Sequence, residues 1–285
     1  MRVTAYSQIG AGKKECQDKI LVGDTILSEG YYENTIDLLP AVVAVADGVG
    51  GNSGGELAAF MAVDGVRGFK YYDLLEKGDI AGMIEKINRD IIAYGDENLE
   101  YENMATTLTG IYFSVSGQIL FHVGNTRTYL FSGEYLICCT KDHTAVQEAK
   151  DAHRPIEDIP SNIITACMGD GDELSMKDYL GVENTETHLA NGNMLMLTSD
   201  GIHDYVTDDE IKAIYEQVRN QEANKHNNLK DLLELAVTIG YTPETQVQIE
   251  ETCGYDWKKE FIYTLTKTAR ENGSVDDISI VLILD

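Results

Sequence analysis

Three short and mostly apolar runs place the strongest constraint on the fold of this chain. They cover residues 41–46, 194–198 and 278–284. A short apolar run bounded by turn residues is typical of a β-strand that is covered on both of its faces. Such strands need further layers of structure on either side, so we expect them at the centre of a stacked arrangement.

Four more β-rich segments lie between residues 105 and 139, where turn signals follow one another closely. Short strands joined by tight turns predict an antiparallel meander. The turns are expected at three pairs of residues, Ser116-Gly117, Asn125-Thr126 and Ser132-Gly133.

Helical patterns lie between and after these strands. The predicted helices cover residues 55–69, 79–94, 207–220, 228–239 and 257–271. In the second of them apolar residues recur on one face, and Asp79 is the expected N-cap. Helices between runs of antiparallel strands indicate an α+β fold with stacked sheets inside and helices outside. Because no repeat or linker interrupts the chain, we expect residues 1–285 to form a single domain.

The charge balance excludes several classes of partner. The 285 residues carry 48 Asp and Glu against 22 Lys and Arg, a net charge of −26, and 43% of them are hydrophobic. That hydrophobic content can fill a sizeable core. The acidic excess argues against nucleic acid or an anionic membrane surface as a partner, because either would need a basic face. No apolar run reaches membrane-spanning length, and residues 1–10 lack a signal-peptide pattern.

The five cysteines are odd in number and show no CxxC spacing. This pattern argues against a disulfide framework or a zinc site and indicates reduced thiols, so we expect a cytoplasmic protein. The cysteines are Cys16, Cys138, Cys139, Cys167 and Cys253.

Acidic residues stand at the ends of the apolar runs. Asp47 and Asp200 each end a run and are followed by glycine, while Asp276 and Asp277 immediately precede the last run. A strand end is a rigid platform, and glycine lets the backbone approach a ligand closely. Carboxylate and carbonyl oxygens with neither His nor Cys nearby favour Mg²⁺ or Mn²⁺ over zinc. The sequence therefore predicts a divalent-cation site.

Two other interpretations of these residues stay open. An Asp-Gly pair at a strand end is also an ordinary turn signal. The glycines at positions 48, 50 and 51 can also be interpreted as a phosphate-binding loop. That second interpretation is the weaker one, because the stretch matches neither the P-loop nor a clean GxGxxG pattern and no lysine follows it.

Six sequence blocks, taken in order, resemble the metal-dependent serine/threonine protein phosphatases of the type 2C family, particularly their compact bacterial members. Each block alone is a weak signal, but together they cover essentially the whole chain. The blocks are Cys16-Gln17-Asp18, residues 45–51 with Gly55-Glu56, residues 104–108, residues 123–127, residues 198–204 and residues 273–279.

The resemblance implies a four-layer α-β-β-α sandwich of two antiparallel sheets flanked by helices, with two Mn²⁺ or Mg²⁺ ions in a cleft at one edge. By position, Asp47 would bridge both ions and the carbonyl of Gly48 would bind one of them. Asp200 and Asp276 would complete the other shell, and Asp18 would act directly or through a water.

The resemblance also implies an activity. The family hydrolyses phosphoserine and phosphothreonine by attack of a metal-bridging hydroxide, so Asp47, Asp200 and Asp276 are the expected catalytic residues. The expected partners are phosphorylated proteins, the targets of a serine/threonine kinase. A flap at about residues 142–170 would shape substrate choice, and residues 216–258, longer than usual for the family, are expected to form a helical excursion.

Departures from the family pattern affect three positions. Where the family usually has an arginine that grips phosphate, this chain has Lys13 or Lys14, and we expect weaker phosphate binding by Lys13. Asn125 replaces an aspartate of a third metal site, which argues against a third ion although Asp204 remains nearby. His143 at the start of the flap is either a catalytic acid or, as we favour, a loop histidine.

Three functions compete at this stage. The first is a metal-dependent phosphoprotein phosphatase, and the second is a weak or inactive relative that binds phosphoproteins as a regulatory module. The third, an acidic Mg²⁺-dependent nucleotide hydrolase, lacks a P-loop signature. The retained acids favour the enzyme, namely Asp18, Asp47, Asp200 and Asp276.

Overall fold

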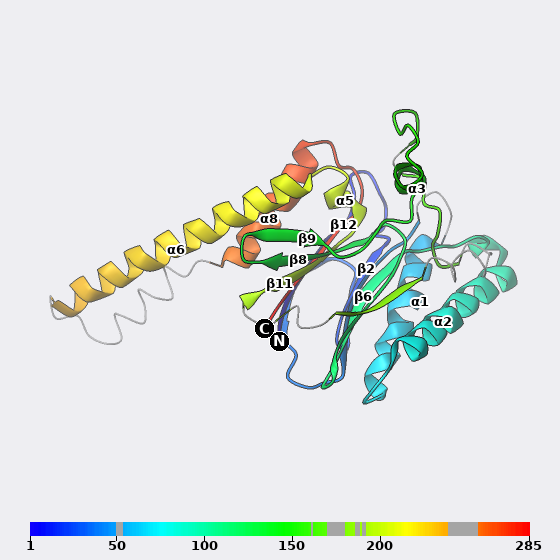
Figure 1. Cartoon of the computed structure of the whole chain (residues 1–285), viewed down its shortest axis with the longest axis horizontal. Helices are drawn as coiled ribbons and strands as arrows, with labels where there is room; N and C mark the ends of the chain where they lie inside the picture. The colour runs from blue at the N-terminus through cyan, green and yellow to red at the C-terminus, as the bar shows by residue number, and fades with distance from the viewer. Residues whose placement is uncertain (50–53, 161, 170–179, 186–188, 190–191, 239–255) are drawn as a thin grey trace.

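The strands of the computed structural model form two antiparallel sheets that are stacked face to face (Figure 1). The structure describes residues 1–49, 54–160, 162–169, 180–185, 189, 192–238 and 256–285. The first sheet has the order β4 (Gly30–Thr35), β1 (Arg2–Gln8), β12 (Ile278–Leu284), β11 (Met194–Thr198), β8 (Arg127–Ser132) and β9 (Tyr135–Cys138). The second has the order β10 (Gly181–Thr185), β7 (Gly117–Val123), β6 (Leu108–Ser114), β5 (Ala41–Asp47), β2 (Asp18–Val22) and β3 (Thr25–Leu27).

Helices cover the outer face of each sheet. In Figure 1, α1 (Gly55–Arg67) and α2 (Lys77–Glu97) lie against the second sheet, while α6 (Asp208–Thr238) and α8 (Trp257–Glu271) lie on the side of the first. The expected four-layer α+β sandwich is therefore confirmed. The remaining helical elements are α3 (Ala145–Asp151), α5 (Asp200–His203) and two 3-10 turns at Gly68–Tyr71 and Leu99–Tyr101.

Three apolar layers hold the sandwich together, and the central strands contribute to two of them. On β5, Val43 and Val45 pack between the sheets, whereas Ala44 packs toward α1 and α2. On β12, Val281 packs between the sheets, whereas Ile280 packs toward α6 and α8. Successive side chains of a strand point to opposite faces, which is why these runs are apolar throughout.

The predicted strands at residues 41–46, 194–198 and 278–284 are confirmed as β5, β11 and β12. The four predicted segments between residues 105 and 139 are also strands, but the single meander is wrong. β6 pairs with β7 in one sheet, and β8 pairs with β9 in the other. The chain crosses between the sheets at residues 124–126, a step that local turn signals do not distinguish from a hairpin.

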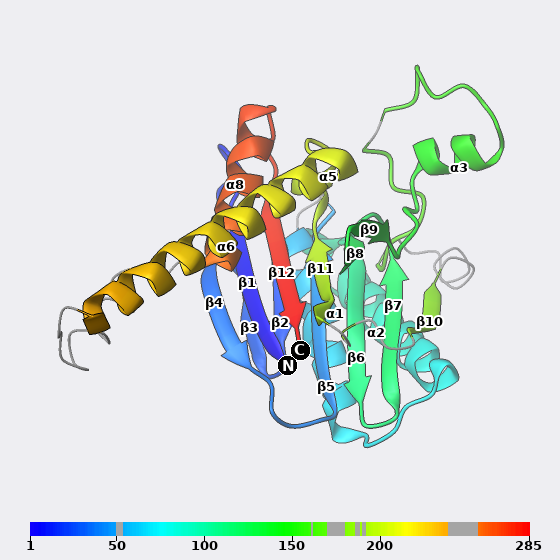
Figure 2. The ribbon, with the colours of Figure 1, turned by 60° about the vertical axis from the view of Figure 1, so that its left-hand side comes forward.

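Two helix predictions need correction. The N-cap of α2 is Glu76, and Asp79 lies at the third helical position, where its carboxylate accepts the amide of Glu76 in a capping box. The helices expected at 207–220 and 228–239 are one continuous helix, α6, which extends from the body of the molecule (Figure 2). Within the described residues, no helix combines the length and the apolarity that crossing a membrane requires.

Some sequence predictions fall outside the described residues. They concern Gly50 and Gly51 of the second block, Cys253, residues 161 and 170 of the flap, and residues 239–255 of the excursion. The other four cysteines form no disulfide among the described residues.

Candidate active site

Strand pairing brings the strand-end acids together at one end of the sandwich. In the second sheet Asp18, the first residue of β2, lies directly opposite Asp47, the last residue of β5. In the first sheet β11 and β12 are antiparallel neighbours, so Asp200 after β11 lies next to Asp276 before β12. The two sheets thus each contribute a pair of acids to a shared edge.

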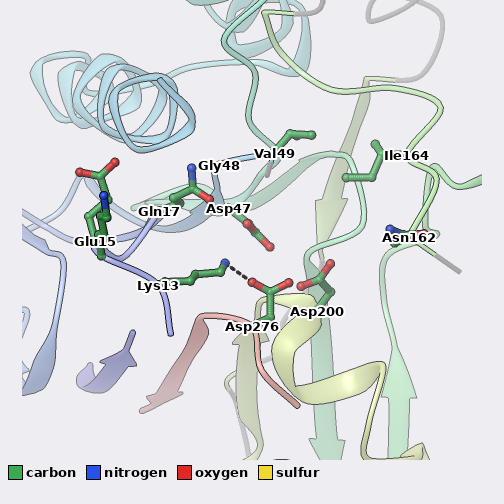
Figure 3. A pocket seen from close by; sticks show the side chains of 11 residues that line it. Lys13, Glu15, Gln17, Asp47, Gly48, Val49, Asn162, Ile164, Asp200 and Asp276 are labelled. Carbon is green, nitrogen blue, oxygen red and sulfur yellow. Dashed lines mark hydrogen bonds and ion pairs between the residues drawn. The ribbon is translucent and has the colours of Figure 1, made fainter. Parts of the chain in front are cut away.

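A cavity of about 490 Å³ opens between these two pairs. Figure 3 shows the carboxylates of Asp47, Asp200 and Asp276 pointing into the same space. The structure therefore brings together the predicted residues Lys13, Asp47, Gly48, Asp200 and Asp276. The full lining is Lys13, Lys14, Glu15, Gln17, Asp47, Gly48, Val49, Asn162, Ile164, Asp200 and Asp276.

The block at residues 104–108 fixes the backbone of Asp47. The Thr107 amide and the Thr106 hydroxyl both donate to the Asp47 carbonyl at 2.9 Å. The Asp47 amide donates in turn to the Thr107 hydroxyl at 3.1 Å. Only glycine fits at position 48 without a shift of the backbone, because a Cβ there would lie 2.4 Å from the carbonyl oxygen of Gly55. Two of the sequence blocks thus meet to hold the backbone of Asp47 in place.

The cavity carboxylates repel one another. Burial, followed by the charges of Asp18, Asp200 and Asp276, raises the pKa of Asp47 well above its ordinary range. Burial and the charge of Asp276 raise the pKa of Asp200 in the same way. Carboxylates that share a site disfavour each other's charged form, and a bound cation would relieve this repulsion.

Asp18 is fully buried, and burial together with the charge of Asp277 raises its pKa. Within the described part of the chain neither of its carboxylate oxygens has a hydrogen-bond partner, and the same holds for Oδ1 of Asp200. An unpartnered buried carboxylate is costly, so these oxygens are suited to a cation.

Lys13 lines the cavity and is ion-paired there. Its ammonium contacts Oδ1 of Asp276 and lies 3.1 Å from Oδ2 of Asp277 (Figure 3). Burial works against the charged ammonium, but the hydrogen bonds and charges of these two carboxylates outweigh it and raise the pKa of Lys13. Lys13 is thus positioned at the cavity, and its role in holding phosphate stays a prediction.

Asp277 is a residue of the site to which the sequence assigned no role beyond its position next to Asp276. Its carboxylate accepts the amide of Gly10 at 2.7 Å and the amide of Gln17 at 2.9 Å, besides contacting Lys13. It is 1% exposed. Asp277 therefore fixes the loop at residues 10–17, which carries Lys13 and leads into Asp18.

Asn125 acts as a hydrogen-bond donor to the site. Its side-chain amide donates to Oδ2 of Asp200 at 2.9 Å, while its own Oδ1 is buried without a partner among the described residues. Asp204 is exposed and does not line the cavity. The structure thus leaves the predicted third metal position untested.

His143 is held in the loop that begins the flap. Its Nδ1 accepts the amide of Gly124 at 3.0 Å, and its ring lies 4.8 Å from that of His122. Burial lowers the pKa of His143. Beside it, Arg127 binds both carboxylate oxygens of Asp142, at 2.8 and 2.6 Å. These contacts favour the loop histidine over the catalytic acid.

The donor atoms that face the cavity are of the kind that divalent cations bind. Asp47, Asp200 and Asp276 with the carbonyl of Gly48 supply oxygen donors only, which suits Mg²⁺ or Mn²⁺. In the described ranges no three Asp, Glu, His or Cys side chains are close enough to hold one ion as they stand. The fit therefore depends on the donor chemistry, the unpartnered oxygens and the shared cavity.

Two stacked antiparallel sheets with an acidic cavity at one edge define a phosphatase-like architecture. The profile of the protein phosphatase 2C family matches residues 11–234. The chain belongs to this family of protein phosphatases, as its motifs predicted.

Curated relatives agree with this assignment. The chain is 30% identical over 242 residues to the serine/threonine protein phosphatase PstP of Mycobacterium tuberculosis, covering 82% of this chain and 45% of that protein. It is 28% identical over 203 residues to the serine/threonine phosphatase Stp of Listeria monocytogenes, covering 67% of this chain and 77% of that protein.

Solved structures agree on the fold. The crystal structure of Mycobacterium tuberculosis PstP matches with a TM-score of 0.69 at 21% identity, covering 100% of both chains. The catalytic domain of PstP in complex with two manganese ions matches with a TM-score of 0.67 at 21% identity, again covering 100% of both chains.

Proposed function

We propose that this protein hydrolyses phosphoserine and phosphothreonine in proteins that a serine/threonine kinase has phosphorylated, and that two divalent cations, Mn²⁺ or Mg²⁺, are required. The observation that carries the proposal is the convergence of Asp47, Asp200 and Asp276 on one cavity. The names of the curated relatives and the two manganese ions of the PstP structure support it.

The side chains of the cavity have distinct proposed tasks. Asp47, Gly48, Asp200 and Asp276, with Asp18 behind them, would hold the cations. The bound cations would supply a hydroxide at neutral pH and offset the charge of the phosphoryl group. Lys13, beside Asp276, would bind a phosphate oxygen.

Other contacts preorganise these groups. Thr106 and Thr107 hold the backbone of Asp47, and Asn125 orients the carboxylate of Asp200. Asn162 and Ile164 bring the flap to the edge of the cavity, where they would contact the residues that flank the phosphate. Preorganised donors of this kind need no rearrangement during the reaction.

The test is release of phosphate from a phosphothreonine peptide, with Mn²⁺ or with a chelator. We expect turnover that depends on the cation, and a loss of at least about a hundredfold in Asp47→Asn and in Asp200→Asn. Asp90→Asn, at an exposed position on α2, is the matched control and should keep full activity. Cation-independent turnover, or full activity in either cavity variant, would contradict the proposal.

A binding module is the second candidate, because Lys13 is already ion-paired with Asp276 in the cavity. This alternative predicts that the wild-type protein binds a phosphopeptide without hydrolysing it. Calorimetric binding without phosphate release in the same buffer would favour it over the enzyme.

A further inference from the structure

Helix α8 lies near strands β1 and β4 at one edge of the first sheet (Figure 2). A second cavity opens between these three elements. We name it the α8 groove. Its volume is about 400 Å³, which is in the range of binding clefts. Its lining residues are Tyr6, Gln8, Tyr31, Lys259, Ile262, Tyr263, Thr266, Lys267 and Arg270.

The groove is built from regular elements and not from loops. Tyr6 on β1 lies directly opposite Tyr31 on β4, so the two rings form its floor. The six α8 residues recur at spacings of three and four, which places them on one face of the helix. Tyr263 on that face is 63% exposed, and Tyr31 is 37% exposed. The walls thus present aromatic surface to solvent.

The charge of the α8 groove is opposite to that of the whole molecule. Three of its nine lining residues are cationic and none is acidic, in a chain whose net charge is −26. The ammonium of Lys259 lies 3.7 Å from Asp256, and that of Lys267 lies 3.8 Å from Glu271. The first pair joins Lys259 to the N-cap residue of α8, and the second lies within the helix. Both lysine side chains are more than half exposed, and ion pairs of exposed lysines are weak enough to exchange for another carboxylate.

The wall contains a buried hydroxyl, that of Thr266. Thr266 is 8% exposed, and its Oγ1 makes no hydrogen bond among the described residues. An unpartnered buried hydroxyl is costly, and a backbone group of a bound peptide would satisfy it.

We propose that the α8 groove docks an acidic peptide segment of a partner protein. The carboxylates of the segment would pair with Lys259 and Lys267, an apolar side chain would pack on Tyr6 and Tyr31, and a main-chain group would bond to Thr266. Charge complementarity selects an acidic occupant, because the rest of the molecule repels such a segment. The inference does not depend on the proposed hydrolysis, since docking is measured as binding.

Fluorescence anisotropy of a short fluorescein-labelled peptide rich in glutamate and leucine tests the docking. We expect saturable binding by the wild-type protein, weakened about tenfold in Lys259→Glu and in Lys267→Glu. Thr266→Val should weaken binding about threefold without lowering the unfolding midpoint, because the hydroxyl it removes has no hydrogen-bond partner in the described part of the chain. Arg270 is not substituted in this experiment, because its guanidinium donates hydrogen bonds to the carbonyls of Ile9 and Asp276 next to the candidate active site.

Lys212→Glu is the matched control, because Lys212 on α6 also pairs with a glutamate four residues later. It should bind the peptide like the wild type, and a peptide with lysine in place of glutamate should not bind. If Lys212→Glu and Lys267→Glu weakened peptide binding equally, the effect would come from the net charge of the protein, and the proposal would be overturned. No saturable binding by the wild type would overturn it as well. If the wild-type protein formed a dimer that Lys267→Glu dissociated, the α8 groove would bind a second copy of the chain, and the proposed acidic segment of a partner protein would be overturned.

Discussion

Lys13 holds a position where an arginine would bind phosphate through two parallel hydrogen bonds. Its single ammonium is shared between Asp276 and Asp277. A point charge held in this way binds a phosphate oxygen without bidentate geometry. We therefore expect Lys13→Ala to raise KM for a phosphothreonine peptide about fivefold with little change in kcat, as steady-state kinetics at saturating Mn²⁺ would measure.

Lys14 provides the control for this prediction. It lines the same cavity and neighbours Lys13 in sequence, but it is exposed. Lys14→Ala should leave KM unchanged. A rise in KM confined to Lys14→Ala would transfer the phosphate-binding role to that residue, and no rise in either variant would remove it from both.

At the same scale, the position at strand ends predicts the cavity acids but does not separate the roles of Asp276 and Asp277. Asp276 and Asp277 are adjacent carboxylates before the same strand, and composition does not distinguish them. In the structure Asp276 lines the cavity while Asp277 binds the amides of Gly10 and Gln17. Neighbouring side chains of an extended segment face opposite ways, so the sequence indicates that only one of the two carboxylates faces the cavity. The loop that binds the other carboxylate is known only from the fold.

Among the elements, a buried histidine, His122, lies at the end of β7 just before the chain crosses to β8. Nδ1 of His122 lies 2.7 Å from the Thr109 hydroxyl, and Nε2 lies 2.9 Å from the Lys141 carbonyl. The carbonyl can only accept, so Nε2 carries the proton of a neutral ring. Burial, and then the charge of His143, lowers the pKa of His122 from 6.5 to about 4.

The lowered pKa of His122 predicts the direction in which the free energy of unfolding changes with pH. Between pH 6.5 and about 4 the unfolded chain binds a proton at His122 that the folded chain does not, so stability falls as the pH falls through this window. We expect His122→Gln to reduce the loss of unfolding free energy between pH 7 and pH 5 by about 2 kcal/mol, as urea titrations would measure. Exposed His153→Gln should keep the wild-type dependence, and an equal reduction there would contradict the assignment to His122.

Element boundaries were predicted best where apolar residues mark them. α8 was predicted at its observed bounds because its apolar residues recur at helical spacing over the whole helix. The pattern predicts two helices in place of α6, because residues 221–227 between them are polar apart from Ala223. Gln, Glu, Ala and Lys nevertheless favour helix, so an absence of apolar periodicity there did not mean an absence of helix.

For the molecule as a whole, the two-sheet sandwich could be predicted because three layers of apolar contacts require strands that are apolar on both faces. The assignment of each strand to a sheet could not. β7 and β8 are neighbours in sequence but belong to different sheets, and β1 pairs with β12 from the far end of the chain. Such pairings depend on packing between distant segments, which local patterns do not encode.

The net charge of −26 also acts on the whole molecule, and part of it lies where Asp18, Asp47, Asp200 and Asp276 approach and repel one another. Cations that bind the folded cavity and not the unfolded chain should raise the free energy of unfolding, by about 2.7 kcal/mol at a hundred times their dissociation constant. Thermal unfolding in Mn²⁺ and in chelator, at ionic strength matched with NaCl, would measure the shift. Asp47→Asn should lose most of the shift and Asp90→Asn should keep it. Equal stabilisation by NaCl alone would attribute the effect to general screening of charge and not to the cavity.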